Sequence, residues 1–257
     1  MKPKLSELLA VATEAAYIAG RRTLAYFNTP IEIDLKSDET PVTIADRESE
    51  HLIRAHIAKY FPSHSVLGEE HGSIAGDADY KWIIDPIDGT KTFVQGVPLY
   101  GVMIGVEVKG AASVGVIYLP AVDEMVSAAL GEGCWWNGRR ARVSKTSELA
   151  KAALMVSDMR MAMDRSPAFG ALSSKARLVR TWGDCFGYVL VATGRADVMV
   201  DPKLSPWDCA PLPPILSEAG GKFTSWRGEA THNVTDGFAT NGLLHHQVLE
   251  VIRQYEK

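Results

Sequence analysis

The segment 82–90, with the sequence WIIDPIDGT, constrains this chain more than any other part of it. Its apolar start, residues 82–84, predicts a short buried strand that ends at Asp85. A carboxylate at the end of a buried strand is costly unless it is paired or bound to a cation. Asp85 and Asp88 also repel each other, and a hard divalent cation would relieve that repulsion. Mg²⁺ prefers oxygen ligands of this kind together with phosphate oxygens, so the segment predicts a metal site.

The next two residues, Gly89 and Thr90, suit the binding of a phosphate. If a helix begins there, its free backbone N–H groups can hold a phosphate beside the metal. The Thr90 hydroxyl can orient a water molecule, and two ions about 4 Å apart can clamp the entering and leaving oxygens. An Asp-x-x-Asp segment is also common as a capped turn, and this alternative stays open for the segment taken by itself.

Composition favours an ordinary globular protein. The 257 residues are 46% hydrophobic and 23% charged, with a net charge of -4, which argues against a disordered chain and against a nucleic-acid-binding protein. Three scattered cysteines predict neither a disulfide framework nor a zinc site. Residues 1–26 lack the continuous apolar core of a secretory signal, and no segment approaches the ~20 apolar residues that span a bilayer. We therefore expect a soluble cytoplasmic protein without a membrane partner.

Periodicity predicts two α/β subdomains, residues 1–143 and 144–257. Helices are expected over 4–27 and from a capping box at Thr43–Asp46 to about Tyr60. Alternating apolar residues predict strands between 99 and 130, and Asn137-Gly138 predicts a hairpin turn. Beyond residue 144, helices and strands alternate. The helices are expected over 166–173, 185–193 and 243–255, and the strands over 154–157, 196–200 and from Phe223.

Three motifs in this order resemble the inositol monophosphatase family of Mg²⁺-dependent phosphatases. They are Gly68-Glu69-Glu70, the segment 82–90, and Trp207-Asp208 followed by Glu218-Ala219-Gly220-Gly221. The resemblance extends from Lys36 to Gly242. It implies a layered α-β-α-β-α sandwich of the inositol monophosphatase and fructose bisphosphatase type. It also implies a phosphate monoester as substrate and a homodimer.

The resemblance also implies a role for each matching residue. Two Mg²⁺ ions, with a third possible at Glu69, would be held by Glu69, Asp85, the Ile87 carbonyl, Asp88 and Asp208. Glu69 and Thr90 would position the attacking water, with Asp46 as the acidic partner of Thr90. The N–H groups of Gly89 and Thr90 would hold the phosphate.

Structural alternatives stay open for several of these residues. Asp46 is also the acid of a capping box, and Asp208 could be a helix N-cap. Lys36 resembles a basic residue that lies near the metals in the family, but it could equally be a solvated lysine. Prolines at 211, 213 and 214 predict a late or bent helix after Asp208, which makes the placement of this ligand the least secure.

The segments 181–188, 191–197 and 200–202 are similar to the histidinol-phosphate phosphatase branch of the family. Histidinol phosphate carries an ammonium group and an imidazole, which Asp184 and Asp201 could pair with and Trp182 could face. Asp184 could instead be the N-cap of the helix that follows. The rival substrates are inositol phosphates, other sugar phosphates and adenosine bisphosphates, and a non-catalytic binding protein is a rival of another class.

Overall fold

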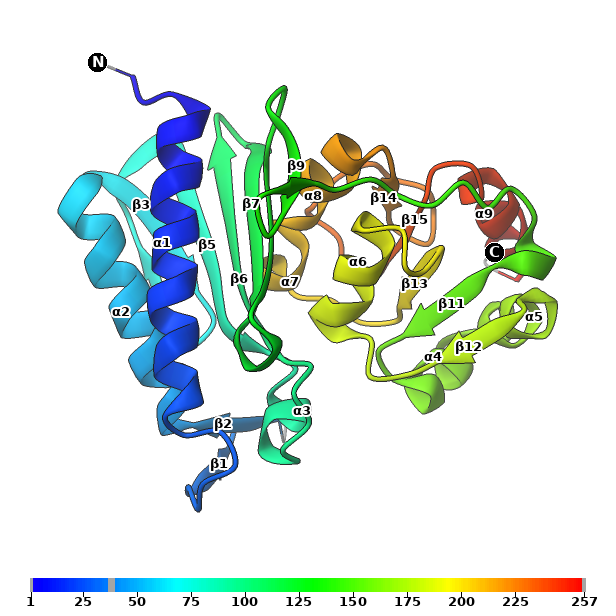
Figure 1. The fold of residues 1–257 in the computed structure, drawn as a ribbon, viewed down its shortest axis with the longest axis horizontal. Coiled ribbons are helices and arrows are strands. Elements are labelled where there is room, and N and C mark those ends of the chain that lie inside the picture. Colours follow the sequence, from blue (N-terminus) through cyan, green and yellow to red (C-terminus); the bar gives the residue numbers. More distant parts are fainter. Residues whose placement is uncertain (1, 37–39, 256–257) are drawn as a thin grey trace.

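The computed structural model describes residues 2–36 and 40–255, in which layers of helices alternate with two sheets (Figure 1). Helices α1 (Leu5–Leu24) and α2 (Ile44–Tyr60) lie side by side over the outer face of an eight-stranded sheet. The expected α-β-α-β-α sandwich is confirmed. The layers beyond this sheet are three helices, a five-stranded sheet and three outer helices. The three middle helices are α6 (Asp184–Ala192), α7 (Pro206–Cys209) and α8 (Leu212–Ala219). The three outer helices are α4 (Met159–Arg165), α5 (Pro167–Lys175) and α9 (His245–Arg253).

The eight-stranded sheet has the order β10-β9-β8-β7-β6-β5-β3-β4, and only its β3–β5 pair is parallel. Its strands are β3 (His64–Gly68), β4 (Gly72–Ile74), β5 (Asp77–Asp88), β6 (Gly101–Val108), β7 (Ala111–Leu119), β8 (Glu124–Ala129), β9 (Gly133–Trp136) and β10 (Arg139–Arg140). A small arm of β1 (Ile33–Leu35) and β2 (Pro41–Thr43) precedes α2, and the short helix α3 (Thr90–Val94) follows β5.

The five-stranded sheet has the order β12-β11-β13-β15-β14, parallel from β12 to β13 and antiparallel beyond it. Its strands are β11 (Ala153–Val156), β12 (Leu178–Arg180), β13 (Val198–Asp201), β14 (Lys222–Thr224) and β15 (Gly237–Thr240). The first sheet therefore uses residues 64–140 and the second uses residues 153–240. The division of the chain at 143/144 into subdomains stays a prediction.

Three large apolar clusters hold the layers together. Small residues of α1, such as Ala12, Ala15 and Ala19, pack against the outer face of the first sheet. The cluster between the sheets joins that sheet to α6 and α8, and the third cluster packs α5 and α9 on the far face of the second sheet. Burial of apolar surface on both faces of each sheet is the main stabilising contribution to such a sandwich.

Two glycines allow the C-terminal half to approach the first sheet closely. Gly105 on β6 and Gly115 on β7 are direct cross-strand neighbours. A Cβ on Gly115 would collide with the carbonyl oxygen of Pro211, and one on Gly105 would lie 2.5 Å from the Cβ of Ala210. The backbone between α7 and α8 therefore rests directly on the sheet, which brings α7 next to the end of β5.

Several predicted elements are confirmed, and some boundaries were wrong. The Thr43–Asp46 capping box starts α2, and Asn137 and Gly138 have φ values of 44° and 76°, as a tight hairpin turn needs. The first helix ends at Leu24, three residues before the expected end at residue 27. Helix α4 and the β1–β2 arm are missing from the prediction, because both are too short for periodicity to detect.

The three cysteines, for which we expected no disulfide framework, are free, and all three are buried. Over residues 2–36 and 40–255, no helix combines the length and the apolar character needed to cross a membrane.

Substitution of Gly115 by alanine tests the close approach of the two halves. The added methyl group meets the Pro211 carbonyl, so we expect the free energy of unfolding to fall by about 1–3 kcal/mol in urea denaturation. Gly170→Ala on α5 is the matched control, since its nearest neighbour would be 3.6 Å away and alanine favours a helix. Equal stability of the two variants would show that the layers have room between them.

Candidate metal centre and substrate cavity

The end of β5 supplies two carboxylates from one irregular stretch of strand. β5 pairs regularly with β6 up to Asp85, opposite Met103, and the register then shifts before Asp88 lies opposite Gly101. The predicted end of the strand at Asp85 was wrong, because the strand continues to Asp88 through this irregularity. Asp85 is 2% exposed, and its Oδ1 accepts the Ile87 N–H at 3.0 Å. The shift lets both carboxylates leave the strand on the same side.

The third carboxylate comes from α7, in the other half of the chain. Asp208 is the third residue of this helix, and its Oδ2 accepts the Ser205 N–H at 2.7 Å in a capping box. It is therefore not the N-cap. The prolines act as expected: the helix stops at Cys209, and α8 starts at Leu212 directly after Pro211. The separation of the two helices leaves Asp208 in its own short, anchored turn.

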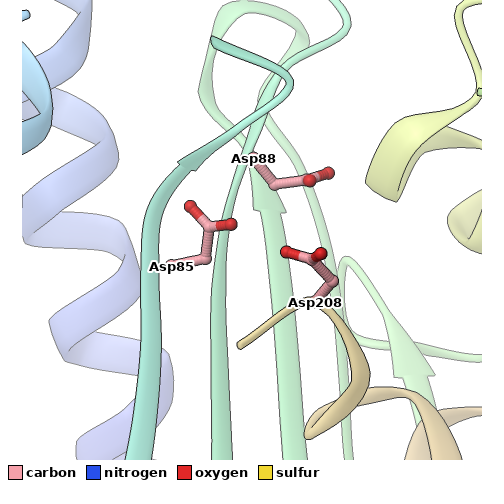
Figure 2. A group of neighbouring side chains, drawn as sticks. All are labelled: Asp85, Asp88 and Asp208. Carbon is pink, nitrogen blue, oxygen red and sulfur yellow. The ribbon is translucent and has the colours of Figure 1, made fainter. Parts of the chain in front are cut away.

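Figure 2 shows Asp85 and Asp208 directed toward each other, with Asp88 beside them. One carboxylate oxygen from each lies within 4.8 Å of the others. Burial, and then the neighbouring negative charges, raise the pKa of Asp85 and Asp88 well above the ordinary value, and burial raises the pKa of Asp208 to about 7. Three carboxylates with mutual repulsion, Asp85 buried and the other two half-buried, fit a hard divalent cation, which would remove the repulsion.

Asp88 also connects this cluster to α6. Its Oδ2 accepts the backbone N–H of Cys185 at 2.5 Å, in the first turn of that helix. A helix N-terminus stabilises negative charge, so the contact favours the ionised form of Asp88 against the effect of burial. The cluster is thereby held by three separate elements, β5, α6 and α7.

Thr90 lies in the first turn of α3, after Gly89 with a φ of 79°. The Thr90 hydroxyl donates to the Ile87 carbonyl at 3.0 Å and lies 3.5 Å from Asp46 Oδ1. The other oxygen of Asp46 accepts from the N–H and the hydroxyl of Thr43, at 2.8 and 2.6 Å. Asp46 thus serves as the capping acid and also faces Thr90. Burial raises its pKa to about 6.

Glu69 lies in the turn between β3 and β4, outside the group formed by the three aspartates. Its N–H donates to the Ile84 carbonyl at 3.2 Å, which ties the turn to β5. Its carboxylate pairs with the Lys36 ammonium at 2.7 Å, and the same ammonium pairs with Glu70 at 2.5 Å. The alternative of a solvated Lys36 is therefore wrong. Glu69 and Lys36 line the same cavity as the cluster.

The cavity has a volume of about 880 Å³, and Asp184 and Asp201 lie in its wall. Asp184 Oδ2 accepts the Thr92 hydroxyl at 2.9 Å. The N-cap of α6 is Gly183, so the N-cap alternative for Asp184 is wrong. Asp201 ends β13, and its Oδ1 accepts the Ser157 hydroxyl at 2.6 Å. Burial raises the pKa of both carboxyls, so each would gain from a cationic partner.

Trp182 completes this part of the wall and is 42% exposed. Trp182 and Asp184 both have positive φ values, 60° and 31°, on either side of Gly183. Such backbone conformations are rare for residues with a Cβ and often occur at functional sites.

Sequence reasoning missed one wall of the cavity, formed by Ser157, Asp158 and the start of α4. No motif marks these residues. A weak signal was available, since Asp158 is the N-cap of α4 and accepts the Met161 N–H at 2.9 Å.

Known proteins are similar to this chain in sequence and in fold. A model of the inositol monophosphatase family matches residues 4–257. Histidinol-phosphatases from Chlorobaculum parvum and Mycobacterium tuberculosis are 44% and 40% identical to it, over 89% and 85% of this chain and 89% and 87% of theirs. An IMPase structure from Thermotoga maritima superposes with a TM-score of 0.89 at 29% identity, covering 96% of this chain and 97% of that one.

The fold and these similarities define a phosphatase. The chain belongs to the inositol monophosphatase family, and the predicted resemblance to that family is confirmed. Its acidic cluster agrees with the metal dependence that is general in this family.

Asp85→Asn tests whether the cluster is held together by a cation. The substitution removes one repelling charge and keeps the acceptor for Ile87, so in the presence of a chelator the variant should melt at or above the wild-type temperature. Mg²⁺ at 100 times its dissociation constant should stabilise the folded wild type by about 2.7 kcal/mol and so raise its melting temperature. It should not raise the melting temperature of the variant.

Asp79→Asn, at a half-buried position near the start of the same strand, is the control and should respond to Mg²⁺ as the wild type does. Equal stabilisation of Asp85→Asn and Asp79→Asn by Mg²⁺ would contradict a metal site at Asp85.

Proposed function

We propose that this phosphatase hydrolyses L-histidinol phosphate to L-histidinol and phosphate with Mg²⁺. The observation that carries the proposal is the pair Asp184 and Asp201, a half-buried and a buried carboxylate in the wall of the cavity that also contains the aspartate cluster. A substrate with an ammonium group and an imidazole gives each carboxylate a cationic partner, whereas an inositol ring offers only hydroxyls. The names of the two histidinol-phosphatase relatives support the same substrate.

The metal-binding residues of this proposal are Glu69, Asp85, Asp88, Asp208 and the carbonyl of Ile87. Two Mg²⁺ ions, or three with a further ion at Glu69, would supply Lewis-acid stabilisation of the phosphate and its leaving oxygen. Glu69 then has to exchange its pairing with Lys36 for a metal, and Lys36 stays paired with Glu70.

The remaining residues act on the water and the phosphate. Thr90 is placed to orient the attacking water through its hydroxyl, together with Glu69. Asp46, 3.5 Å from that hydroxyl, accepts a proton from Thr90, and a pKa near 6 suits proton exchange around neutral pH. The N–H groups of Gly89 and Thr90, at the start of α3, hold the phosphate. We further propose a cytoplasmic homodimer, in line with the family resemblance.

Phosphate release from a panel of substrates tests the assignment. With Mg²⁺, we expect kcat/KM for histidinol phosphate to exceed that for inositol phosphate and for adenosine bisphosphate. Relatives named fructose-1,6-bisphosphatase/inositol-1-monophosphatase, such as the Thermotoga maritima protein at 33% identity, make the inositol phosphate comparison the critical one. Equal rates on histidinol phosphate and inositol phosphate would overturn the assignment, and no turnover of any substrate would favour a binding protein.

Asp184→Asn tests the recognition of the cationic group. Asparagine still accepts from Thr92, so the cavity should keep its shape while KM for histidinol phosphate rises about 10- to 100-fold, as expected for the loss of a charged hydrogen bond. KM for inositol phosphate should change little.

The control is Asp158→Asn, in the same cavity, because asparagine caps a helix as well as aspartate does. A similar rise in KM for this control, or an equal effect of Asp184→Asn on inositol phosphate, would argue against specific charge pairing.

A further inference from the structure

One face of α2 carries three charged side chains in succession, Asp46, Glu50 and Arg54. They are four residues apart, so they project from the same side of the helix on successive turns. Asp46 faces Thr90, as described above. Glu50 points to the turn that carries Glu69, and it is fully buried, at 0% exposed. A carboxylate buried to this extent is rare unless it is paired.

Glu50 binds the backbone of that turn directly. Its Oε2 accepts the Glu70 N–H at 2.7 Å, and its Oε1 accepts the His71 N–H at 3.2 Å. Arg54 donates from Nε to the same Oε1 at 2.6 Å and from Nη2 to the Gly72 carbonyl at 2.5 Å. A single buried ion pair on α2 therefore fixes three consecutive residues after Glu69, through bonds strengthened by charge.

The packing at Gly68 makes this contact a close one. A Cβ on Gly68 would overlap with the carboxylate of Glu50 and would lie 2.8 Å from Arg54 Nη2. On the other side, the Glu69 N–H donates to the Ile84 carbonyl of β5. The backbone of Glu69 is thus held between β5, which carries Asp85, and the charged face of α2.

We propose that Glu50, oriented by Arg54, is the positioning residue that sets Glu69 beside the aspartate cluster for metal binding. The inference rests on the proposed function, in which Glu69 binds a metal. It adds a residue of α2 that acts through the turn backbone, with no contact to metal or substrate.

Glu50→Gln tests the role, because glutamine has the same size but loses the charge and replaces one acceptor by a donor. Mn²⁺, followed by electron paramagnetic resonance, is the probe, at a temperature below the melting point of the metal-free variant. We expect the Mn²⁺ dissociation constant to rise about 10- to 100-fold, as is typical when a partner of a metal ligand is removed. Glu48→Gln is the control, because Glu48 lies on the same helix and pairs with Arg22 of α1 near the surface; this variant should bind Mn²⁺ normally.

Wild-type Mn²⁺ affinity in Glu50→Gln overturns the proposal, even where the variant melts earlier, because lost stability alone does not change affinity in the folded protein. If Glu50→Gln does not fold, Arg54→Lys decides, since lysine keeps the charge but cannot bridge Glu50 and Gly72; unchanged affinity there also overturns the proposal. Glu69→Gln, measured in parallel, distinguishes the metal-binding role of Glu69 from the positioning role of Glu50. If it binds Mn²⁺ normally, the metal role of Glu69 itself is wrong; if it alone weakens binding, only the positioning role of Glu50 is wrong.

Discussion

The structure depends on holding three like-charged carboxylates close together at one end of a largely buried strand. Asp85, Asp88 and Asp208 come from both halves of the chain, and their repulsion and desolvation oppose the fold wherever no cation is bound. Backbone N–H groups offset part of this unfavourable energy: Ile87 donates to Asp85, Cys185 to Asp88 and Ser205 to Asp208. The cluster is therefore preorganised by the main chain, and its net charge is left for a cation to neutralise.

The surrounding helices and the first sheet position the residues of the aspartate cluster and their neighbours. Gly105 and Gly115 let the α7–α8 connection rest on the first sheet, which sets Asp208 against β5. Helix α2 supplies Asp46 to Thr90 on one turn and Glu50 to the backbone after Glu69 on the next. Residues far apart in the chain thus converge through two rigid elements, a helix and a sheet, which hold a site more accurately than loops can.

Sequence patterns identified those features of the structure that depend on a few neighbouring residues. The capping box of α2, the Asn137-Gly138 turn and the buried run before Asp85 each have a signature of a few residues, and family motifs pointed to all three clustered aspartates. The Lys36–Glu69 pair, the glycines under the α7–α8 connection and the burial of Glu50 depend on contacts across tens of residues. No spacing rule encodes such contacts. A charged residue on α2 is indistinguishable in sequence from one on a solvated helix face.

The direct contact of backbone with sheet at Gly105 and Gly115 has a mechanical consequence. Because the sheet presents glycine at this contact, the α7–α8 connection packs too closely for the two sheets to slide past each other. A hinge motion between them would separate Asp208 from Asp85. We therefore expect substrate to enter and product to leave at the edge of the cavity, where Pro41 of the β1–β2 arm and Met159 of α4 lie. The packed interface between the two sheets should stay rigid during this exchange.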